Sequence, residues 1–325
     1  MPKRLLLATI CVACCTSTIS LAQVLSVSEL SSRDLQELDR DRTVVMIPGG
    51  IFEQHGPYLP SFTDGYLNEW IARCTAEAIV AKRDLIVLMF PTIPLGVGSP
   101  EDFGGLSPFS GSYTLRPETL RAVYMDLASG LGQDGFRTIF VVNRHGAPAH
   151  NKALLDAAKY FNDRFDGTMA VLTSLIHEDG MKVPDHLTPK QTLENGMAVH
   201  AGEEESSQML FLRPDLVHDD ISDGSAYTAA SPEDLIKIAE EPGWKGYFGS
   251  PRLATPSAGA LIVNYRTSQT IDLALRILDG FDWRSLRTRA DRNGMTPSFK
   301  TADDNNLVRA EQERKKQEEW LRKNR

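Results

Sequence analysis

The sequence predicts an α/β fold whose doubly wound, mostly parallel sheet is flanked by helices on both faces. Short, almost wholly apolar runs alternate with longer segments of helical pattern along the chain. Strands that are apolar on both sides are typical of parallel sheets covered by helices on each face. Polar clusters also follow two of these runs directly. Ligands bind such sheets beyond the carboxyl ends of the strands, so these clusters form the candidate site.

Strands and helices alternate regularly through the first half of the chain. Strands are predicted at residues 43–47, 85–90, 138–142 and 169–175. Helices are predicted at residues 64–81, 117–131 and 151–165, and Thr63 or Asp64 would cap the first of them. The second half is more irregular, with helical patterns near residues 204–211, 232–240 and 257–278.

The two ends of the chain differ in composition from this domain, which we place at residues 23–295. Residues 1–22 are predicted to be a signal peptide, because Lys3 and Arg4 precede an apolar run and a small-x-small cleavage site that ends at Ala22. A periplasmic or secreted protein is therefore expected; a buried N-terminal strand or helix is the alternative. Residues 296–325 form a charged tail, either a solvated helix or a disordered end.

Composition and charge exclude some functions. The chain has 325 residues, of which 42% are hydrophobic and 24% charged, and its formal net charge is −8. It has no basic stripe, so duplex nucleic acid is not an expected partner, and no membrane contact is expected after the leader is removed. Only Cys74 remains outside residues 1–22, which leaves no intramolecular disulfide. A metal ion would have to be bound by His, Asp and Glu.

The first polar cluster consists of Glu53, His55 and Asp64, which follow the predicted strand at residues 43–47. Glu53 and His55 are two residues apart and point the same way on an extended segment. Imidazole and carboxylate groups together suit zinc, manganese or iron, and a carboxylate shared by two metals is common in hydrolases. The alternative is a loop with capping acids and a surface histidine.

The second and third clusters also follow predicted structure. His145 comes just after the strand at residues 138–142, where it would face the site, although an exposed turn histidine is the alternative. His150 could line the pocket or cap a helix, and Arg144 could bind an anionic substrate group or form a structural salt bridge. The segment from His200 to Ser207 carries three acids that suit a helix N-terminus, but one of them could bind metal and His200 could shuttle a proton.

A Gly-rich segment at residues 96–103, together with residues 111–115, is predicted to cover the substrate. It contains Glu101, a candidate substrate contact. It lacks the Gly-Lys-Ser/Thr and GxGxxG patterns, so nucleotide binding is not expected.

Four motifs in order resemble the creatininase (creatinine amidohydrolase) family, and the resemblance covers roughly residues 40–280. The motifs lie at residues 53–64, 135–146, 200–207 and 246–259. The resemblance implies two divalent ions, zinc or manganese with iron as a further option, and attack of a metal-bound hydroxide on an amide. It also implies a homo-oligomer, often a hexamer. The implied metal ligands are Glu53, His55, Asp64 (bridging), His145 and Glu205, and the implied catalytic residues are His200, as proton donor, and Glu205.

The chain departs from the family pattern near the site. Tyr58 stands where the family often has a second histidine, Arg144 replaces a glycine, and Val199 replaces an acid. Creatinine is therefore not the expected substrate, and Tyr58 becomes a candidate substrate contact. We expect a metal-dependent amidohydrolase that cleaves a non-peptide or cyclic amide C–N bond of a small molecule. The alternatives are a lactone, ester or small-peptide hydrolase, or a catalytically silent exported binding protein.

Overall fold

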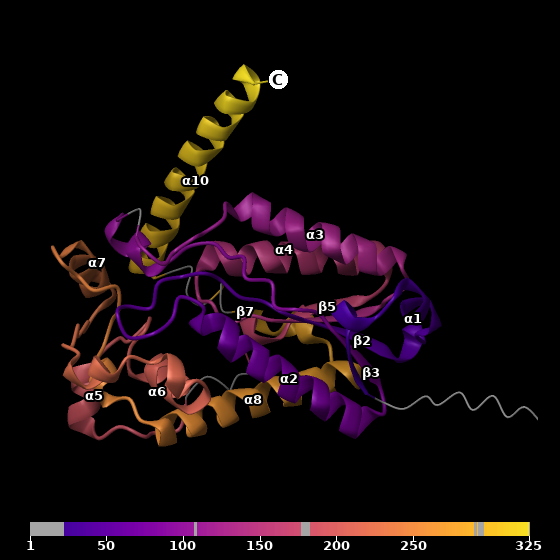
Figure 1. Cartoon of the computed structure of the whole chain (residues 1–325), viewed down its shortest axis with the longest axis horizontal. Coiled ribbons are helices and arrows are strands. Elements are labelled where there is room, and N and C mark those ends of the chain that lie inside the picture. The colour runs from indigo at the N-terminus through magenta and orange to yellow at the C-terminus, as the bar shows by residue number, and fades with distance from the viewer. Residues whose placement is uncertain (1–22, 107–108, 177–182, 289–290, 292–295, 325) are drawn as a thin grey trace, which may run out of the picture.

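The central feature of the computed structural model is a parallel sheet enclosed by helices (Figure 1). The structure describes residues 23–106, 109–176, 183–288, 291 and 296–324. The expected signal peptide at residues 1–22 lies outside the described residues. Within them, none of the helices combines the length and the apolar character that crossing a bilayer requires.

The five strands of the main sheet run parallel in the order β1-β3-β2-β4-β5. All six residues of β2 are buried, and Val45 of β2 lies between Leu88 of β3 and Ile139 of β4. After β2 the chain moves to β3 on one side, and after β4 it moves to β5 on the other. The strand order therefore reverses between β2 and β4, which is where ligands bind in open sheets. The strands are β1 (Val24–Ser26), β2 (Thr43–Pro48), β3 (Ile86–Met89), β4 (Thr138–Val142) and β5 (Thr168–Val171).

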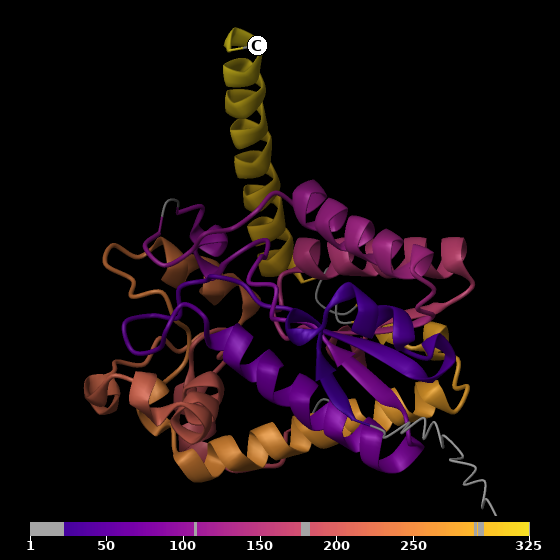
Figure 2. The same ribbon diagram turned by 45° about the vertical axis from the view of Figure 1, so that its right-hand side comes forward.

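Helices cover both faces of the sheet because successive β2 side chains point to opposite sides. Val45 and Ile47 pack in one apolar cluster with residues of α3 (Pro117–Gln133) and α4 (Pro148–Phe165). Val44 and Met46 pack in another with residues of α2 (Thr63–Arg83) and α8 (Pro256–Leu278). Figures 1 and 2 show the α3/α4 pair and the α2/α8 pair on opposite sides of the sheet. The predicted doubly wound α/β fold is confirmed.

Several boundaries differ from those expected. The strand predicted at residues 169–175 ends at Val171, and the chain then forms η4 (Leu172–Ser174) and β6 (Leu175–Ile176), which pairs with β7 (Arg287–Thr288). Neither Thr63 nor Asp64 caps α2, because Phe62 holds the N-cap position and the Thr63 hydroxyl donates to the Pro60 carbonyl. Helix α4 begins at Pro148, whose fixed φ suits the first turn of a helix.

Shorter elements connect the sheet to its periphery. The N-terminal segment forms turns and one short helix before β2, and the region after β6 forms the helices that carry the third polar cluster. These elements are η1 (Val27–Glu29), α1 (Ser32–Glu37), η2 (Arg40–Arg42), η3 (Pro100–Gly104), α5 (Pro189–Asn195), α6 (Glu203–Leu212), η5 (Pro214–Leu216), η6 (Asp219–Asp223), α7 (Pro232–Glu240), η7 (Pro251–Leu253) and η8 (Trp283–Ser285).

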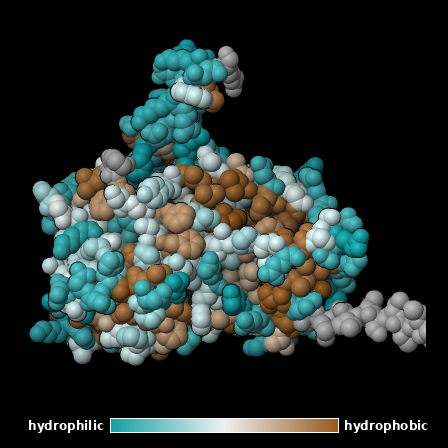
Figure 3. All heavy atoms as spheres, viewed as in Figure 1, coloured by the Kyte–Doolittle hydropathy of each residue, from teal (hydrophilic) through white to brown (hydrophobic). Residues whose placement is uncertain are grey.

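The last helix, α10 (Pro297–Lys323), is docked at its start and free at its end. Phe299 packs edge-on against Phe103 of η3, with ring centroids 5.3 Å apart. Arg309 makes a two-pronged ion pair with the buried Asp102 carboxylate, and the Asp303 carboxylate accepts a hydrogen bond from the Ala149 N–H at the start of α4. Beyond these contacts α10 projects from the body with a mostly hydrophilic surface (Figures 2 and 3), so only this outer half is a solvated helix.

Replacing Arg309 with Met should destabilise the fold by about 1.5–3 kcal/mol near neutral pH, which is typical of hydrogen bonds to a charged group. Burial raises the pKa of Asp102, and Arg309 opposes that rise. Without Arg309, ionised Asp102 keeps its desolvation cost but loses its counter-charge. The defect should therefore be full near neutral pH and shrink as the pH falls into the acidic range, where Asp102 takes up a proton. Urea unfolding in the two pH ranges measures it.

The matched control is Arg314→Met on the projecting half of α10, where Arg314 forms exposed ion pairs with Glu311 and Glu318. Such pairs contribute little, so the control should change the unfolding free energy by less than about 0.5 kcal/mol. Equal losses in the two variants, or an Arg309 defect that does not change with pH, would contradict this account of the α10 anchor.

Candidate metal centre

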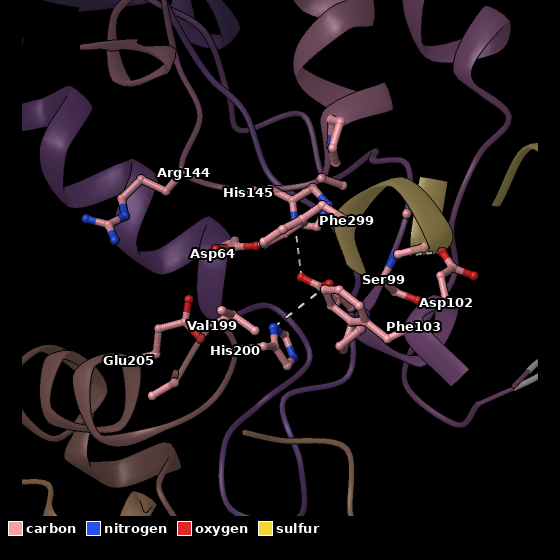
Figure 4. Close-up of a pocket in the computed structure, with 18 of the residues that line it drawn as sticks. Asp64, Ser99, Asp102, Phe103, Arg144, His145, Val199, His200, Glu205 and Phe299 are labelled. Carbon is pink, nitrogen blue, oxygen red and sulfur yellow. Dashed lines mark hydrogen bonds and ion pairs between the residues drawn. The ribbon is translucent and has the colours of Figure 1, made fainter. Parts of the chain in front are cut away.

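The polar clusters meet at the point where the strand order reverses (Figure 4). Glu53 and His55 follow β2, and His145 follows β4. Asp64 enters from the first turn of α2. Glu205 lies in the first turn of α6, and His200 lies in the loop just before it. Residues that are up to 152 positions apart in the sequence thus share one site, as the sequence analysis expected.

Backbone carbonyl groups fix the orientation of all three histidines. His55 Nδ1 lies 2.9 Å from the Glu53 carbonyl oxygen, His145 Nε2 lies 2.9 Å from that of Val97, and His200 Nε2 lies 2.6 Å from that of Gln54. A carbonyl oxygen only accepts hydrogen bonds, so each of these ring nitrogens carries the hydrogen. The other nitrogen of each ring is left for the centre, which is the usual arrangement of histidine ligands to metals.

The remaining histidine nitrogens face carboxylates. His145 Nδ1 lies 3.0 Å from Glu53 Oε2 and 3.4 Å from Asp64 Oδ2. His55 Nε2 lies 3.8 Å from Glu205 Oε2, and His200 Nδ1 lies 4.0 Å from Glu53 Oε1. The ligand atoms form three groups within each of which they lie no more than 4.8 Å apart: Glu53, Asp64 and His145; His55, Asp64 and Glu205; and Glu53, His55 and His200.

The backbone before α6 is strained in a way that serves this arrangement. Ala201 has a φ of 49°, in the left-handed region that costs a residue with a side chain roughly 1–2 kcal/mol. Its N–H donates to Glu205 Oε2 over 2.6 Å. The strain therefore helps to hold the Glu205 carboxylate against the centre.

Burial and neighbouring charges shift the pKa values of the centre strongly. Burial raises the pKa of Glu53 to about 7. Burial alone would lower the pKa of His145, but the Glu53 and Asp64 carboxylates raise it well above its ordinary value. Burial would raise the pKa of Asp64, yet His145 and His55 hold it below its ordinary value. Burial and the neighbouring His55 lower the pKa of His200 well below its usual range.

The donor set fits a divalent cation. Glu53 Oε2 and His55 Nε2 are buried and make no hydrogen bond. When neutral His145 donates its Nε2–H to the Val97 carbonyl oxygen, His145 Nδ1 and Glu53 Oε2 face each other with lone pairs across 3.0 Å. Two acceptors at that separation need a proton or a cation between them. Imidazole nitrogens and carboxylate oxygens are the ligands that zinc, manganese and iron take in proteins.

A cavity of about 400 Å³ opens onto the centre. One wall is the start of α10, with Phe299, Ala302, Asp303 and Asn306, and another is the segment from Gly98 through Phe103. A further side carries Arg144, Glu204 and Arg266. Arg266, Phe299 and Asp303 are not predicted from the sequence, because nothing in their local sequence separates them from ordinary helix residues.

Three expected substrate contacts lie elsewhere. Tyr58 is buried against Tyr247, with ring centroids 5.9 Å apart, in an apolar cluster outside the cavity wall. Glu101 is buried on the other side of η3 and lines a separate groove along α10, and burial raises its pKa. Of the four expected contacts, Arg144 alone lines the cavity.

His150 stands behind the centre. Its Nδ1 accepts a hydrogen bond from the Val97 N–H over 3.2 Å, while the Val97 carbonyl accepts from His145. Its ring also packs edge-on against His145, with centroids 4.9 Å apart. It therefore positions His145 through Val97 and does not form part of the cavity wall.

Most of the chain is similar to proteins of one family. Residues 28–274 match the family model Creatininase, described as Creatinine amidohydrolase. The mycofactocin precursor peptide peptidase of Mycolicibacterium smegmatis is 24% identical over 82% of this chain and 94% of its own length. The creatinine amidohydrolase of Pseudomonas putida is 30% identical over 31% of this chain and 37% of its own length.

Solved structures share the fold. A structure named Creatininase Mn is 22% identical, covers 78% of this chain and 98% of its own, and has a TM-score of 0.57. A mutant creatininase of Zn-Zn type is 23% identical, covers 78% and 97% of the two chains, and has a TM-score of 0.58. A putative creatinine amidohydrolase from Bacteroides fragilis is 25% identical over 77% and 94%, with a TM-score of 0.55.

Zinc should raise the Tm of the wild-type chain by several degrees, since a ligand at about 100 times its Kd adds about 2.7 kcal/mol to the folded state. Asp64→Asn should lose most of that rise, because Asp64 belongs to two of the three groups of ligand atoms. Differential scanning fluorimetry with and without zinc measures it. Glu101→Gln, which neutralises a buried carboxyl outside the centre, should keep the full rise. An undiminished rise in Asp64→Asn would contradict the assignment.

Proposed function

This chain belongs to the creatininase (creatinine amidohydrolase) family, whose members hydrolyse amide bonds, and we propose that it cleaves a non-peptide or cyclic amide C–N bond with two divalent metal ions. The observation that carries the two-metal proposal is the overlap of two of the ligand groups. Glu53, Asp64 and His145 form one group and His55, Asp64 and Glu205 form the other, so the two share only Asp64. Asp64 would then be shared by two ions, with Glu53 and His145 holding one and His55 and Glu205 the other.

Zinc or manganese is the proposed metal, with iron as a further option, because the same nitrogen and oxygen donors accept all three. The relatives support this choice, since the creatininase structures of this fold include one named for Mn and one of Zn-Zn type. Metal ions in such a centre polarise a carbonyl oxygen and lower the pKa of bound water to about 7.

His200 is the proposed proton carrier. Its Nε2–H is held by the Gln54 carbonyl, and its Nδ1 faces the centre, 4.0 Å from Glu53 Oε1. An imidazole fixed in this way would accept a proton at Nδ1 when water adds to the amide carbonyl carbon. It would then return that proton to the amide nitrogen as the C–N bond breaks. Glu205, held by the Ala201 N–H, is the acid of α6 that reaches the centre and remains the second proposed catalytic residue.

The substrate is a small molecule and is not creatinine. A cavity of about 400 Å³ lies in the range of small-ligand pockets. The departures at Arg144 and Val199, which both line the cavity, point away from creatinine. A small peptide is the second candidate, since the mycobacterial relative that aligns over most of this chain is named a peptidase.

Export and assembly are further parts of the proposal. The order of charge, apolar run and cleavage site in residues 1–22 supports a periplasmic or secreted protein. A homo-oligomer is the expected assembly in this family, and sedimentation velocity of the purified chain would test it.

The function is tested on purified protein by metal analysis and by a panel of cyclic amides, linear amides, lactones and short peptides. Bound zinc, manganese or iron together with turnover of a small amide is the expected result. A chain that binds none of these metals, and gains no activity when they are added, would contradict the proposal. Turnover of lactones or peptides alone would show that the proposed substrate class is wrong, while the proposed metal centre would stand.

His200→Gln should lower kcat for the best substrate of that panel by about 100-fold or more, because general acid–base residues contribute about 10²–10⁴. Metal content should stay at the wild-type value, since Glu53, His55, Asp64, His145 and Glu205 remain. His218→Gln is the control, because His218 lies outside the cavity at the start of η6. Loss of one metal equivalent in His200→Gln would show that His200 is a ligand instead.

A further inference from the structure

We propose that the apolar wall beside the metal centre binds an aromatic ring of the substrate, so that the amide cleaved at the centre belongs to a small aromatic molecule. The inference rests on the proposed function, because it names the substrate class of the same site. The apolar wall consists of those residues of one hydrophobic cluster that line the cavity: Phe103, Met197, Val199, Phe299 and Ala302.

The apolar wall is the open side of this cluster. Phe103 and Ala302 are buried. Met197, Val199 and Phe299 are half-buried, and all three line the cavity. Half-buried apolar side chains around a concave site keep part of their surface in water, and an apolar group of a ligand gains free energy by covering that surface. The cluster therefore presents apolar surface to the molecule that occupies the cavity.

Aromatic packing supports the apolar wall from behind. The ring of Phe103 lies edge-on to that of Phe248, with centroids 5.6 Å apart, and edge-on to that of Phe299, with centroids 5.3 Å apart. Trp244 packs on Phe248 at 5.1 Å. A substrate ring that lies against Phe299 would extend this series, and aromatic pairs of this kind stabilise beyond the area that they bury. The occupant that fits best is therefore an aromatic ring.

The backbone joins the apolar wall to the metal centre. Val199 directly precedes His200, the proposed proton carrier. The His200 carbonyl accepts a hydrogen bond from the Phe248 N–H over 2.9 Å, and the Met197 N–H donates to the carbonyl of Ala229, another residue of the cluster, over 2.8 Å. A ring on the apolar wall thus lies beside the residue that transfers the proton, so one small molecule can carry both the ring and the amide.

Helix α10 makes the apolar wall a feature of this chain. Phe299 lies in the first turn of α10, beyond the end of the family match at residue 274. Figure 4 shows Phe103 and Phe299 on one side of His200 and Glu205 on the other. The substrate ring therefore binds on the α10 side of the centre.

Isothermal titration of the zinc-loaded chain with phenylacetohydroxamic acid and acetohydroxamic acid tests the proposal. Both probes carry a metal-binding hydroxamate, and they differ only in the phenyl ring. Wild type should bind the phenyl probe about tenfold or more tightly, as burial of an apolar ring predicts. Phe299→Ala should reduce that preference to less than about threefold, while acetohydroxamate binding and zinc content stay unchanged. Val199→Thr, which keeps the shape and adds a hydroxyl, should lower the preference too and is the second variant if Phe299→Ala does not fold.

The matched control is Phe109→Ala. Phe109 is half-buried in the same cluster, with its ring centroid 6.0 Å from that of Trp244, and it lines the separate groove along α10. This variant should keep the wild-type preference. A phenyl preference that persists in both cavity variants would overturn the inference, and so would the absence of any preference in wild type.

Failure of the proposed function gives a different result. A chain that binds no zinc contradicts the metal-dependent function, and phenylacetamide and acetamide then replace the hydroxamates as probes for the same variants. A phenyl preference that Phe299→Ala removes supports the aromatic site on its own. Equal binding of the two amides to wild type overturns it.

Discussion

The burial of several carboxylates at one point of the sheet is the constraint on which the rest of the structure depends. Glu53 and Asp64 are almost fully buried beside Glu205, and ionised acids in such a place need cations or protons as partners. In this protein the partners are histidines whose rings are held by the carbonyls of Glu53, Gln54 and Val97. The carbonyls that orient these rings therefore come from the loops after β2 and β3.

The sheet explains why these loops meet. The chain leaves β2 toward one edge and β4 toward the other, so the two loops open away from each other and leave a crevice at their carboxyl ends. Glu53 and His55 come from one side of that crevice and His145 from the other. Helices α2 and α6 then point their first turns, with Asp64 and Glu205, at the same crevice. The positive ends of both helices favour carboxylates there.

The parts of the candidate site that follow directly after apolar runs could be predicted from the sequence. The strands at residues 43–47 and 138–142 were predicted from apolar runs alone, and the polar residues that follow them form the centre. Arg266, Phe299 and Asp303 have no such signal, because close packing of α8 on α6 and docking of α10 on η3 bring them to the cavity. Tyr58 and Glu101 lie outside the cavity for the opposite reason: both stand beside motif residues, but Tyr58 packs against Tyr247 and Glu101 lines a separate groove.

The docking of α10 connects the fold to substrate choice. The residues of α10 that line the cavity lie beyond residue 274, where the family match ends. Asp102 and Asp303 hold this helix from two sides, through Arg309 and through the start of α4. The ion pair between Arg309 and Asp102 therefore joins α10 to segment 98–103. Val97, which directly precedes this segment, orients His145 through its carbonyl. A change in α10 would alter the space above the centre and the support of His145 together, so substrate size and the integrity of the candidate metal centre are expected to depend on each other.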